Sequence, residues 1–166
     1  MRAVIVGNSG SGKTWFAKRL AEASSSRVVH LDEIFWLPGG FNTKRDARDV
    51  SHLIESEMAN AAWIAEGVYG DLAKQFMPNA DTFIWLELPL SVCLQRLKRR
   101  GSESRAHMGR EQSEAGLLEL VSWAEDYASR QGSSGRAAHL ELFESFKGQR
   151  LRFSSESEVL EFLNAA

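Results

Sequence analysis

Eight residues near the start of the chain have the spacing of a loop that binds phosphate groups. They are Gly7, Asn8, Ser9, Gly10, Ser11, Gly12, Lys13 and Thr14, which match the pattern G-x-x-x-x-G-K-[ST]. In such a loop, backbone N–H groups and the N-terminus of the next helix face the phosphates. We expect the Lys13 ammonium group to contact the β- and γ-phosphates and the Thr14 hydroxyl to bind Mg²⁺.

The segments on either side of this loop fit the same interpretation. An apolar run over residues 3–6 predicts a strand, and residues 15–23 predict a helix. A glycine-rich turn without a ligand is the alternative. The dinucleotide pattern G-x-G-x-x-G fits poorly, because its third glycine would fall on Trp15.

Two carboxylates lie at the ends of further predicted strands. Asp32 follows a strand predicted over residues 27–31, and Glu66 follows one predicted over residues 63–65. At these positions Asp32 is a candidate Mg²⁺ ligand or general base, and Glu66 is a candidate second carboxylate at the metal. The alternatives are a helix cap or turn for Asp32 and a surface position for Glu66.

A basic segment follows the strand predicted over residues 82–88. Its basic residues are Arg96, Lys98, Arg99, Arg100, Arg105 and Arg110, with Glu103 as the acidic residue among them. We interpret residues 100–113 as a lid whose guanidinium groups hold phosphate and whose closure excludes water. A solvated helix face and a nucleic-acid contact are the alternatives.

The composition narrows the class of protein. The chain has 166 residues, a net charge of −2 and one cysteine, Cys93. These values predict one globular domain over residues 1–166, without an internal disulfide and without global attraction to nucleic acid or anionic membranes. We see neither a membrane-spanning apolar run nor a signal peptide, so we expect a cytoplasmic protein. The most linker-like stretch, residues 131–135, is too short to separate two domains.

Strand-like and helix-like segments alternate along the chain. The strand candidates are residues 2–6, 27–31, 63–65, 82–88 and 150–153. Apolar residues at helical spacing predict helices near residues 50–61, 90–97, 117–124 and 159–163. The alternation indicates an α/β fold with a parallel sheet covered on both faces. Ligands of such sheets bind beyond the carboxyl ends of the strands.

Several segments together resemble one family. They are the loop of residues 7–14, residues 30–39, residues 63–69, and residues 84–89 with 93–96. In these segments the chain resembles adenylate-kinase-like P-loop NTPases, and more narrowly the bacterial members called topology-modulation proteins. The segment of residues 36–39 and the Leu-Pro strand exit at residues 88–89 are more selective than the phosphate loop alone.

The resemblance implies a P-loop NTPase fold with a five-stranded parallel sheet in the order 2-3-1-4-5, and ATP and Mg²⁺ as cofactors. It implies an acceptor-binding region at residues 33–61, the lid at residues 100–113, and a nucleotide base near Ser154 and Ser155. The catalytic residues that it implies are Lys13, Asp32, Arg96, Arg100 and Arg105. The metal candidates are Thr14, Asp32 and Glu66, and the nucleotide contacts are Gly7, Asn8, Ser9, Gly10, Ser11, Gly12, Lys13, Thr14, Trp15 and Ser155.

Some positions depart from the family pattern. Glu66 and Val68 stand where the family usually has Asp and Asn, and Trp15 stands where many relatives carry a second hydroxyl. The longer carboxylate at position 66 shifts the expected metal shell. These departures leave nucleotide binding as the expectation and leave the rate and the acceptor open.

We therefore expect an Mg²⁺-dependent phosphotransferase that moves the γ-phosphoryl group of ATP to a nucleoside monophosphate or a small hydroxylated acceptor. Arg45 and Arg48 are candidates for an acceptor phosphate, with exposed helix charges as the alternative. A second hypothesis is a slow nucleotide-hydrolysing regulator that contacts DNA or protein, and a third is a plain ATPase. No helix-turn-helix or zinc-finger spacing supports the regulator.

Overall fold

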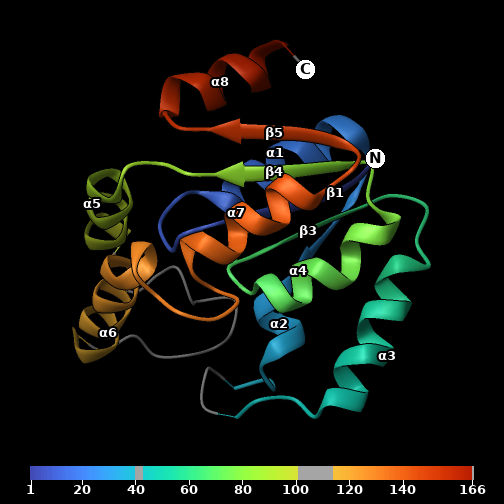
Figure 1. Ribbon diagram of the computed structural model, residues 1–166, viewed down its shortest axis with the longest axis horizontal. Helices are drawn as coiled ribbons and strands as arrows, with labels where there is room; N and C mark the ends of the chain where they lie inside the picture. The colour runs from blue at the N-terminus through green and yellow to red at the C-terminus, as the bar shows by residue number, and fades with distance from the viewer. Residues whose placement is uncertain (40–42, 101–113, 166) are drawn as a thin grey trace.

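The computed structural model describes residues 1–39, 43–100 and 114–165 (Figure 1). Within these residues the sheet has five parallel strands in the order β2-β3-β1-β4-β5, which confirms the predicted fold class and strand order. The strands are β1 (Arg2–Gly7), β2 (Arg27–His30), β3 (Trp63–Gly67), β4 (Thr82–Leu86) and β5 (Gln149–Phe153).

Helices connect the strands and cover both faces of the sheet. They are α1 (Lys13–Ser24), α2 (Leu31–Phe35), α3 (Ala47–Met58), α4 (Gly70–Phe76), α5 (Leu90–Arg100), α6 (Glu114–Glu125), α7 (Arg136–Ser145) and α8 (Glu156–Ala165). Short 3-10 turns lie at η1 (Met77–Asn79) and η3 (Asp126–Ala128). In Figure 1, α4 and α7 lie in front of the sheet and α1 lies behind it.

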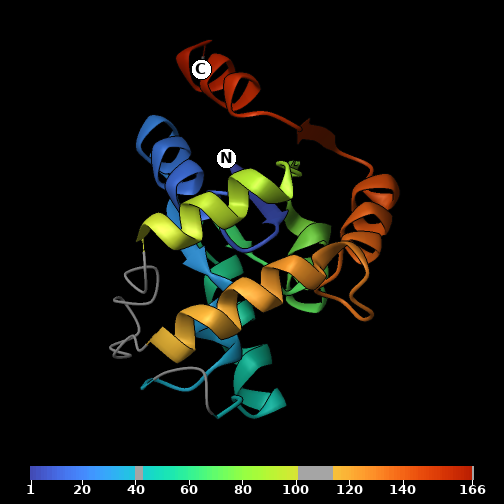
Figure 2. The same cartoon turned by 90° about the vertical axis from the view of Figure 1, so that its left-hand side faces the viewer.

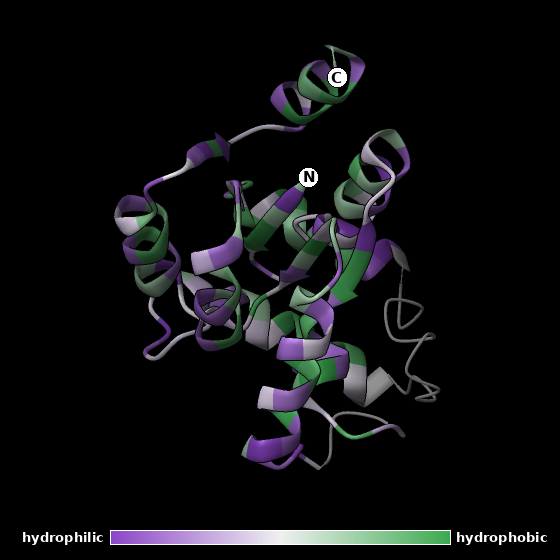
Figure 3. Cartoon of the chain, turned by 90° about the vertical axis from the view of Figure 1, so that its right-hand side faces the viewer, coloured by the Kyte–Doolittle hydropathy of each residue, from purple (hydrophilic) through white to green (hydrophobic). Residues whose placement is uncertain are grey.

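The period-two alternation of the central strand explains the two layers. On β1, Val4 and Val6 pack into one apolar cluster that includes residues of α3, α4 and α7. Ala3 and Ile5 point to the other face, into a cluster with residues of α1 and α8. The helices carry both hydrophobic and hydrophilic residues along their length (Figure 3), as expected when one side of each helix packs on a sheet.

The carboxyl ends of all the strands lie along one edge of the sheet. The arrowheads of β4 and β5 point toward the side on which α5 and α6 lie (Figure 1), and Figure 2 looks at that side. Helices α5 and α6 pack against each other there. The loop of residues 7–14 and the candidate carboxylates are therefore brought to this edge, where ligands of parallel sheets bind.

Some predicted boundaries were wrong. The strands predicted over residues 27–31 and 82–88 end earlier, at His30 and Leu86. Leu31 instead begins α2, a helix of five residues that is too short to show a helical period in the sequence. Asp32 therefore lies in the first turn of a helix, two residues after the last residue of β2.

Candidate active site

The predicted phosphate loop connects the carboxyl end of β1 to the N-terminus of α1. Gly10 and Gly12 have φ angles of 80° and 91°, in the left-handed region that favours glycine. A Cβ atom on Gly12 would lie 2.8 Å from Nη1 of Arg96. Glycine at position 12 therefore lets α1 begin directly beside that arginine, with the N–H groups of its first turn at the carboxyl edge.

Side chains of the loop hold it in this shape. Asn8 is buried, and its amide accepts from the Ser9 N–H at 2.8 Å and donates to the Ala124 carbonyl in α6 at 2.8 Å. The Lys13 ammonium group donates to the Asn8 carbonyl at 2.8 Å. Lys13 thus lies across the loop, where it can exchange this carbonyl for phosphate oxygens.

A buried carboxylate next to the loop is the most distinctive feature of the site. Glu66 lies near the end of β3, with only 5% of its surface exposed. Its Oε1 atom accepts a hydrogen bond from the Thr14 hydroxyl at 3.0 Å and from Nδ1 of His30 at 2.6 Å. Three elements, α1, β2 and β3, therefore meet at one carboxylate oxygen.

Electrostatics keep this carboxylate ionised. Burial alone would raise the pKa of Glu66, but the hydrogen bond from His30 and the positive charge of Lys13 outweigh it and lower the pKa. The same hydrogen bond raises the pKa of His30 against the opposing effect of its burial. Glu66 and His30 therefore form a charged pair beside the phosphate loop.

Glu66 was predicted from the sequence as a candidate carboxylate at the metal, whereas no role was predicted for His30. His30 is the last residue of β2, and its partner is on the neighbouring strand, because β2 and β3 pair in a register that sets His30 opposite Glu66. That pairing was not readable from the sequence. Asp32 and Glu33 also favour the protonated form of His30 and raise its pKa, which places the Asp32 charge near this cluster.

An aromatic cluster lies on the side of the predicted acceptor region. Phe35 and Tyr69 stack with ring centroids 4.3 Å apart and an interplanar angle of 9°. The Trp36 indole donates to the Tyr69 hydroxyl at 2.7 Å. The segments that follow β2 and β3 are thus joined by their aromatic side chains.

Arg45 is used within the protein itself. Its guanidinium group donates to the carbonyl oxygens of Glu33, Ile34 and Trp36 at the end of α2. This geometry favours a structural role for Arg45 over contact with an acceptor phosphate. Arg48 is exposed in the first turn of α3.

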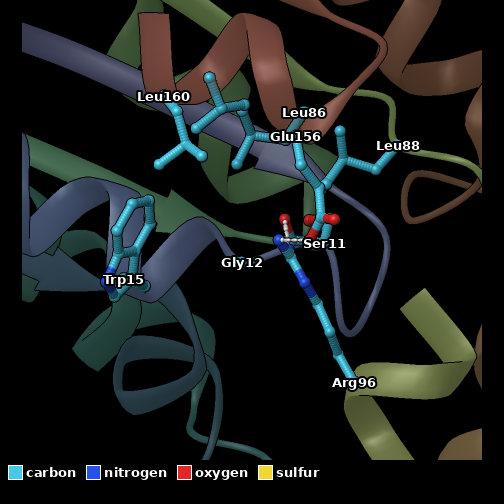
Figure 4. Close-up of a pocket in the computed structure, with 9 residues that line it drawn as sticks. Ser11, Gly12, Trp15, Leu86, Leu88, Arg96, Glu156 and Leu160 are labelled. Carbon is cyan, nitrogen blue, oxygen red and sulfur yellow. Dashed lines mark hydrogen bonds and ion pairs between the residues drawn. The ribbon is translucent and has the colours of Figure 1, made fainter. Parts of the chain in front are cut away.

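A cavity of about 350 Å³ lies beside the phosphate loop (Figure 4). Its wall consists of Ser11, Gly12, Trp15, Leu86, Leu88, Arg96, Glu156, Val159 and Leu160. The Arg96 guanidinium donates to the Ser11 carbonyl at 2.9 Å and pairs with Glu156 at the start of α8. Figure 4 shows Trp15 on the same side of the cavity as Leu160, with Arg96 reaching in from α5.

The remaining predicted site residues lie in different places. Ser155 precedes α8, and its hydroxyl accepts from the Glu158 N–H at 3.3 Å, so it caps that helix next to Glu156 of the cavity wall. Arg100 is the last residue of α5. Arg105 and nearly all of the predicted lid lie outside the described residues.

Comparison with solved structures shows the fold class. The chain is similar to a gluconokinase from Sinorhizobium meliloti 1021, with a TM-score of 0.53, 14% identity, and coverage of 98% of this chain and 87% of that chain. It is also similar to shikimate kinase from Acinetobacter baumannii in complex with shikimate, with a TM-score of 0.56, 16% identity, and coverage of 99% and 90%. The chain therefore has the α/β fold of P-loop kinases.

Comparisons at the sequence level found nothing: no protein-family model matches the chain, and neither does any curated protein. Among the described helices, none is both long and apolar enough to cross a membrane.

Proposed function

We propose that the protein is an ATP-dependent, Mg²⁺-requiring phosphotransferase that acts on a small acceptor carrying a hydroxyl group. The observation that carries this proposal is the shared Oε1 atom of Glu66, which joins the Thr14 hydroxyl of the phosphate loop to an ionised, buried carboxylate. The hydrogen bonds from Thr14 and His30 compensate the burial of this charge. They hold the carboxylate at the N-terminus of α1, where an Mg²⁺ ion bound to the phosphates would need a protein oxygen.

The residues present suit Mg²⁺. In phosphoryl-transfer sites Mg²⁺ takes oxygen ligands, with one or two from the protein and the others from phosphate and water. Thr14 and Glu66 offer a hydroxyl and a carboxylate 3.0 Å apart. Within the described residues no group of three or more His, Cys, Asp and Glu could hold a metal alone. When bound, Mg²⁺ would neutralise charge on the phosphates, and Thr14 and Glu66 would hold it.

The cavity beside the loop suits the base of the nucleotide. One part of the cavity wall is apolar and is formed by Leu86 at the end of β4, Leu88 just after it, and Val159 and Leu160 of α8. The Trp15 indole, which is 41% exposed, also lines the cavity. An aromatic ring at a cavity wall offers a stacking surface for a planar ligand. The phosphate loop at one side of this cavity would then bind the triphosphate, and Lys13 would stabilise the negative charge on the transferred phosphoryl group.

Asp32 is our candidate for the general base. It lies just past β2, close enough to His30 to affect its pKa. In this role its carboxylate would accept the proton of the acceptor hydroxyl as the phosphoryl group transfers. Arg100 and Arg105 stay predictions for lid residues that meet charge on the phosphoryl group. Arg96 contacts the loop on the cavity side, which favours a role in holding the nucleotide.

The test is ATP binding by Lys13→Ala, measured by titration calorimetry with Lys18→Ala on the same helix as the matched control. Lys18 is exposed, so its loss should leave affinity unchanged. We expect K13A to weaken binding by about 100-fold, because it removes charge-assisted hydrogen bonds worth roughly 1.5–3 kcal/mol each. Equal affinity in K13A and wild type would overturn the assignment of the loop.

A screen for ADP release with a panel of small hydroxylated metabolites and nucleoside monophosphates would then identify the acceptor. A sharp rise with one acceptor supports the kinase, and hydrolysis that depends on no acceptor supports a plain ATPase. Salt-dependent binding of DNA by the purified chain would instead support the regulator. The narrower likeness to topology-modulation proteins names no reaction and so adds no candidate acceptor.

A further inference from the structure

A second polar cluster, which is buried, lies beside the residues that follow β3. It consists of Trp85 of β4, Tyr127 and His139 of α7. The Trp85 indole donates to the Tyr127 hydroxyl at 3.1 Å, and that hydroxyl lies 2.7 Å from Nδ1 of His139. Nε2 of His139 lies 2.9 Å from the Val68 carbonyl. His139 and Trp85 are fully buried, and Tyr127 and Val68 are 7% exposed.

Burial lowers the pKa of His139 to about 4, so its ring is neutral, and the chemistry of the two ends then fixes every hydrogen in this chain of bonds. An indole N–H can only donate and a backbone carbonyl can only accept. The Tyr127 oxygen therefore accepts from Trp85, and its own hydrogen is donated to Nδ1 of His139. Nε2 of His139 must then carry the hydrogen that is donated to the Val68 carbonyl. The neutral imidazole therefore has one defined tautomer.

The same segment of backbone is held at a second point. The Gly70 N–H donates to the Ser133 carbonyl at 3.1 Å. A Cβ atom on Gly70 would lie 2.2 Å from that carbonyl oxygen, so this contact requires glycine. Residues 67–70 are thus attached to α7 at Val68 and to the loop of residues 131–135 at Gly70.

The residues on either side of these attachments belong to the candidate active site. Glu66 lies two residues before Val68 and carries the contacts to Thr14 and His30. Tyr69 lies between the two attachment points, where its ring stacks on Phe35 and its hydroxyl accepts from Trp36. Movement of the Val68 carbonyl would therefore displace both the carboxylate and the aromatic cluster.

We propose that His139, oriented by Tyr127, is a positioning residue for phosphoryl transfer: it fixes residues 67–70 so that Glu66 and Tyr69 stay in register with the phosphate loop. The inference rests on the proposed function for its catalytic consequence. It assigns a role to a histidine that lines neither the loop nor the cavity.

The direct test of the hydrogen-bond chain is nitrogen NMR of the histidine rings in the full chain. We expect His139 to be the neutral tautomer with hydrogen on Nε2 and to lose that single tautomer in Tyr127→Phe, which removes only the hydroxyl. A hydrogen on Nδ1 in the wild type would overturn the inference whatever the activity.

The functional test compares two substitutions of the same side chain. In H139Q the new amide nitrogen would reach the place of Nε2, whereas the shorter side chain in H139N would reach only the place of Nδ1. We expect H139N to lower kcat for Mg²⁺-ATP about 10- to 100-fold, as loss of an outer-shell partner does, with the KM for ATP changed less than about twofold. H139Q should restore most of kcat, and H52N, at an exposed histidine of α3, should match the wild type.

The outcomes separate the two proposals. A wild-type chain that does not bind ATP overturns the proposed function and this inference together. An active wild type with equal kcat in H139N overturns the inference alone. If H139N does not fold, Y127F decides: a folded Y127F with mixed His139 tautomers and unchanged kcat also overturns the inference.

Discussion

Two polar clusters lie beside the end of β3, and each contains a histidine. In the cluster of Thr14, Glu66 and His30, the imidazole faces a carboxylate, and the hydrogen bond between them raises the pKa of His30. In the cluster of Trp85, Tyr127 and His139, burial lowers the pKa of His139 to about 4. The first setting favours the charged form of histidine and the second favours the neutral form.

The difference shows that the neighbours of a histidine decide its role. A carboxylate partner makes His30 half of an ion pair, at the place where we propose that Mg²⁺ and the phosphates bind. A hydroxyl and a carbonyl make His139 a fixed hydrogen-bond connection that carries no charge. In our proposals the charged cluster contacts the ligands, and the neutral cluster holds the backbone in place.

The largest expected effect is on turnover, from a substitution of Asp32, which lies near the charged cluster of Thr14, Glu66 and His30. Asp32→Asn should lower turnover by ~10²–10⁴-fold, because it removes a general base, and should leave ATP affinity unchanged. Steady-state kinetics and calorimetry together measure this. Asp49→Asn, at an exposed carboxylate in the first turn of α3, is the control. Full turnover in D32N would remove Asp32 from the mechanism.

The pH dependence of stability should have opposite signs for the two histidines. Because the pKa of His139 is about 4 in the folded state and ordinarily 6.5, only the unfolded chain takes up the proton between these values. The contribution of His139 to the free energy of unfolding is therefore fully present above pH 6.5. It falls by about 3 kcal/mol as the pH drops to about 4. His30 has a raised pKa, so its contribution is complete below pH 6.5 and is lost as the pH rises through its folded-state pKa.

Urea unfolding across this pH range would measure both contributions, each as the difference between the wild type and a variant. The H139Q difference isolates His139, and a His30→Gln difference isolates His30. If the two differences in unfolding free energy changed with pH in the same direction, the two histidines would not be in opposite charge states as we infer.

A smaller effect is expected from Glu66→Gln, which keeps the shape of the side chain and removes its charge. The pKa of His30 should fall, because the hydrogen bond to an ionised carboxylate is the main cause of its rise. The gain in ATP affinity on adding Mg²⁺ should decrease by about 10- to 100-fold. An NMR titration of both histidines would show whether His139 stays unchanged, as two separate clusters require.

The smallest effect is expected from the pair of Arg96 and Glu156, which is more exposed than either cluster. Their side chains are 29% and 53% exposed. Glu156→Gln should cost less than about 1 kcal/mol of unfolding free energy, as partly solvated ion pairs do. Thermal unfolding with Glu161→Gln as the control would measure it. A larger loss would mean that this pair holds α8 on the domain.

Much of the fold could be predicted because its signals are local. The apolar run of β1, the glycines before Lys13 and the alternation of strands with helices are all readable in short windows of sequence. The boundaries were less predictable, since the apolar pattern of β4 continues through Leu88 although the strand ends at Leu86. Residues 131–135 were predicted as linker-like, yet Ser133 packs on Gly70.

The site was predictable only in part, for a related reason. Thr14 and Glu66 could be named from a motif and a strand end, but their direct hydrogen bond depends on how the strands pair. His139 has no motif, and its partner Val68 is 71 residues away in sequence. The only local sign is a histidine among the apolar residues of α7, which by itself indicates burial and not a role.

Trp15 has a consequence for how the protein can be studied. Its indole is 41% exposed at the cavity wall, whereas Trp63 and Trp85 are fully buried. Trp123 is 40% exposed but does not line the cavity, so replacing it with phenylalanine would remove a second solvated emitter. Fluorescence from a solvated indole is red-shifted and easily quenched, while buried rings emit from a constant environment. Binding of a ligand in the cavity should therefore change the fluorescence of Trp15, while the emission of the buried Trp63 and Trp85 serves as an internal reference.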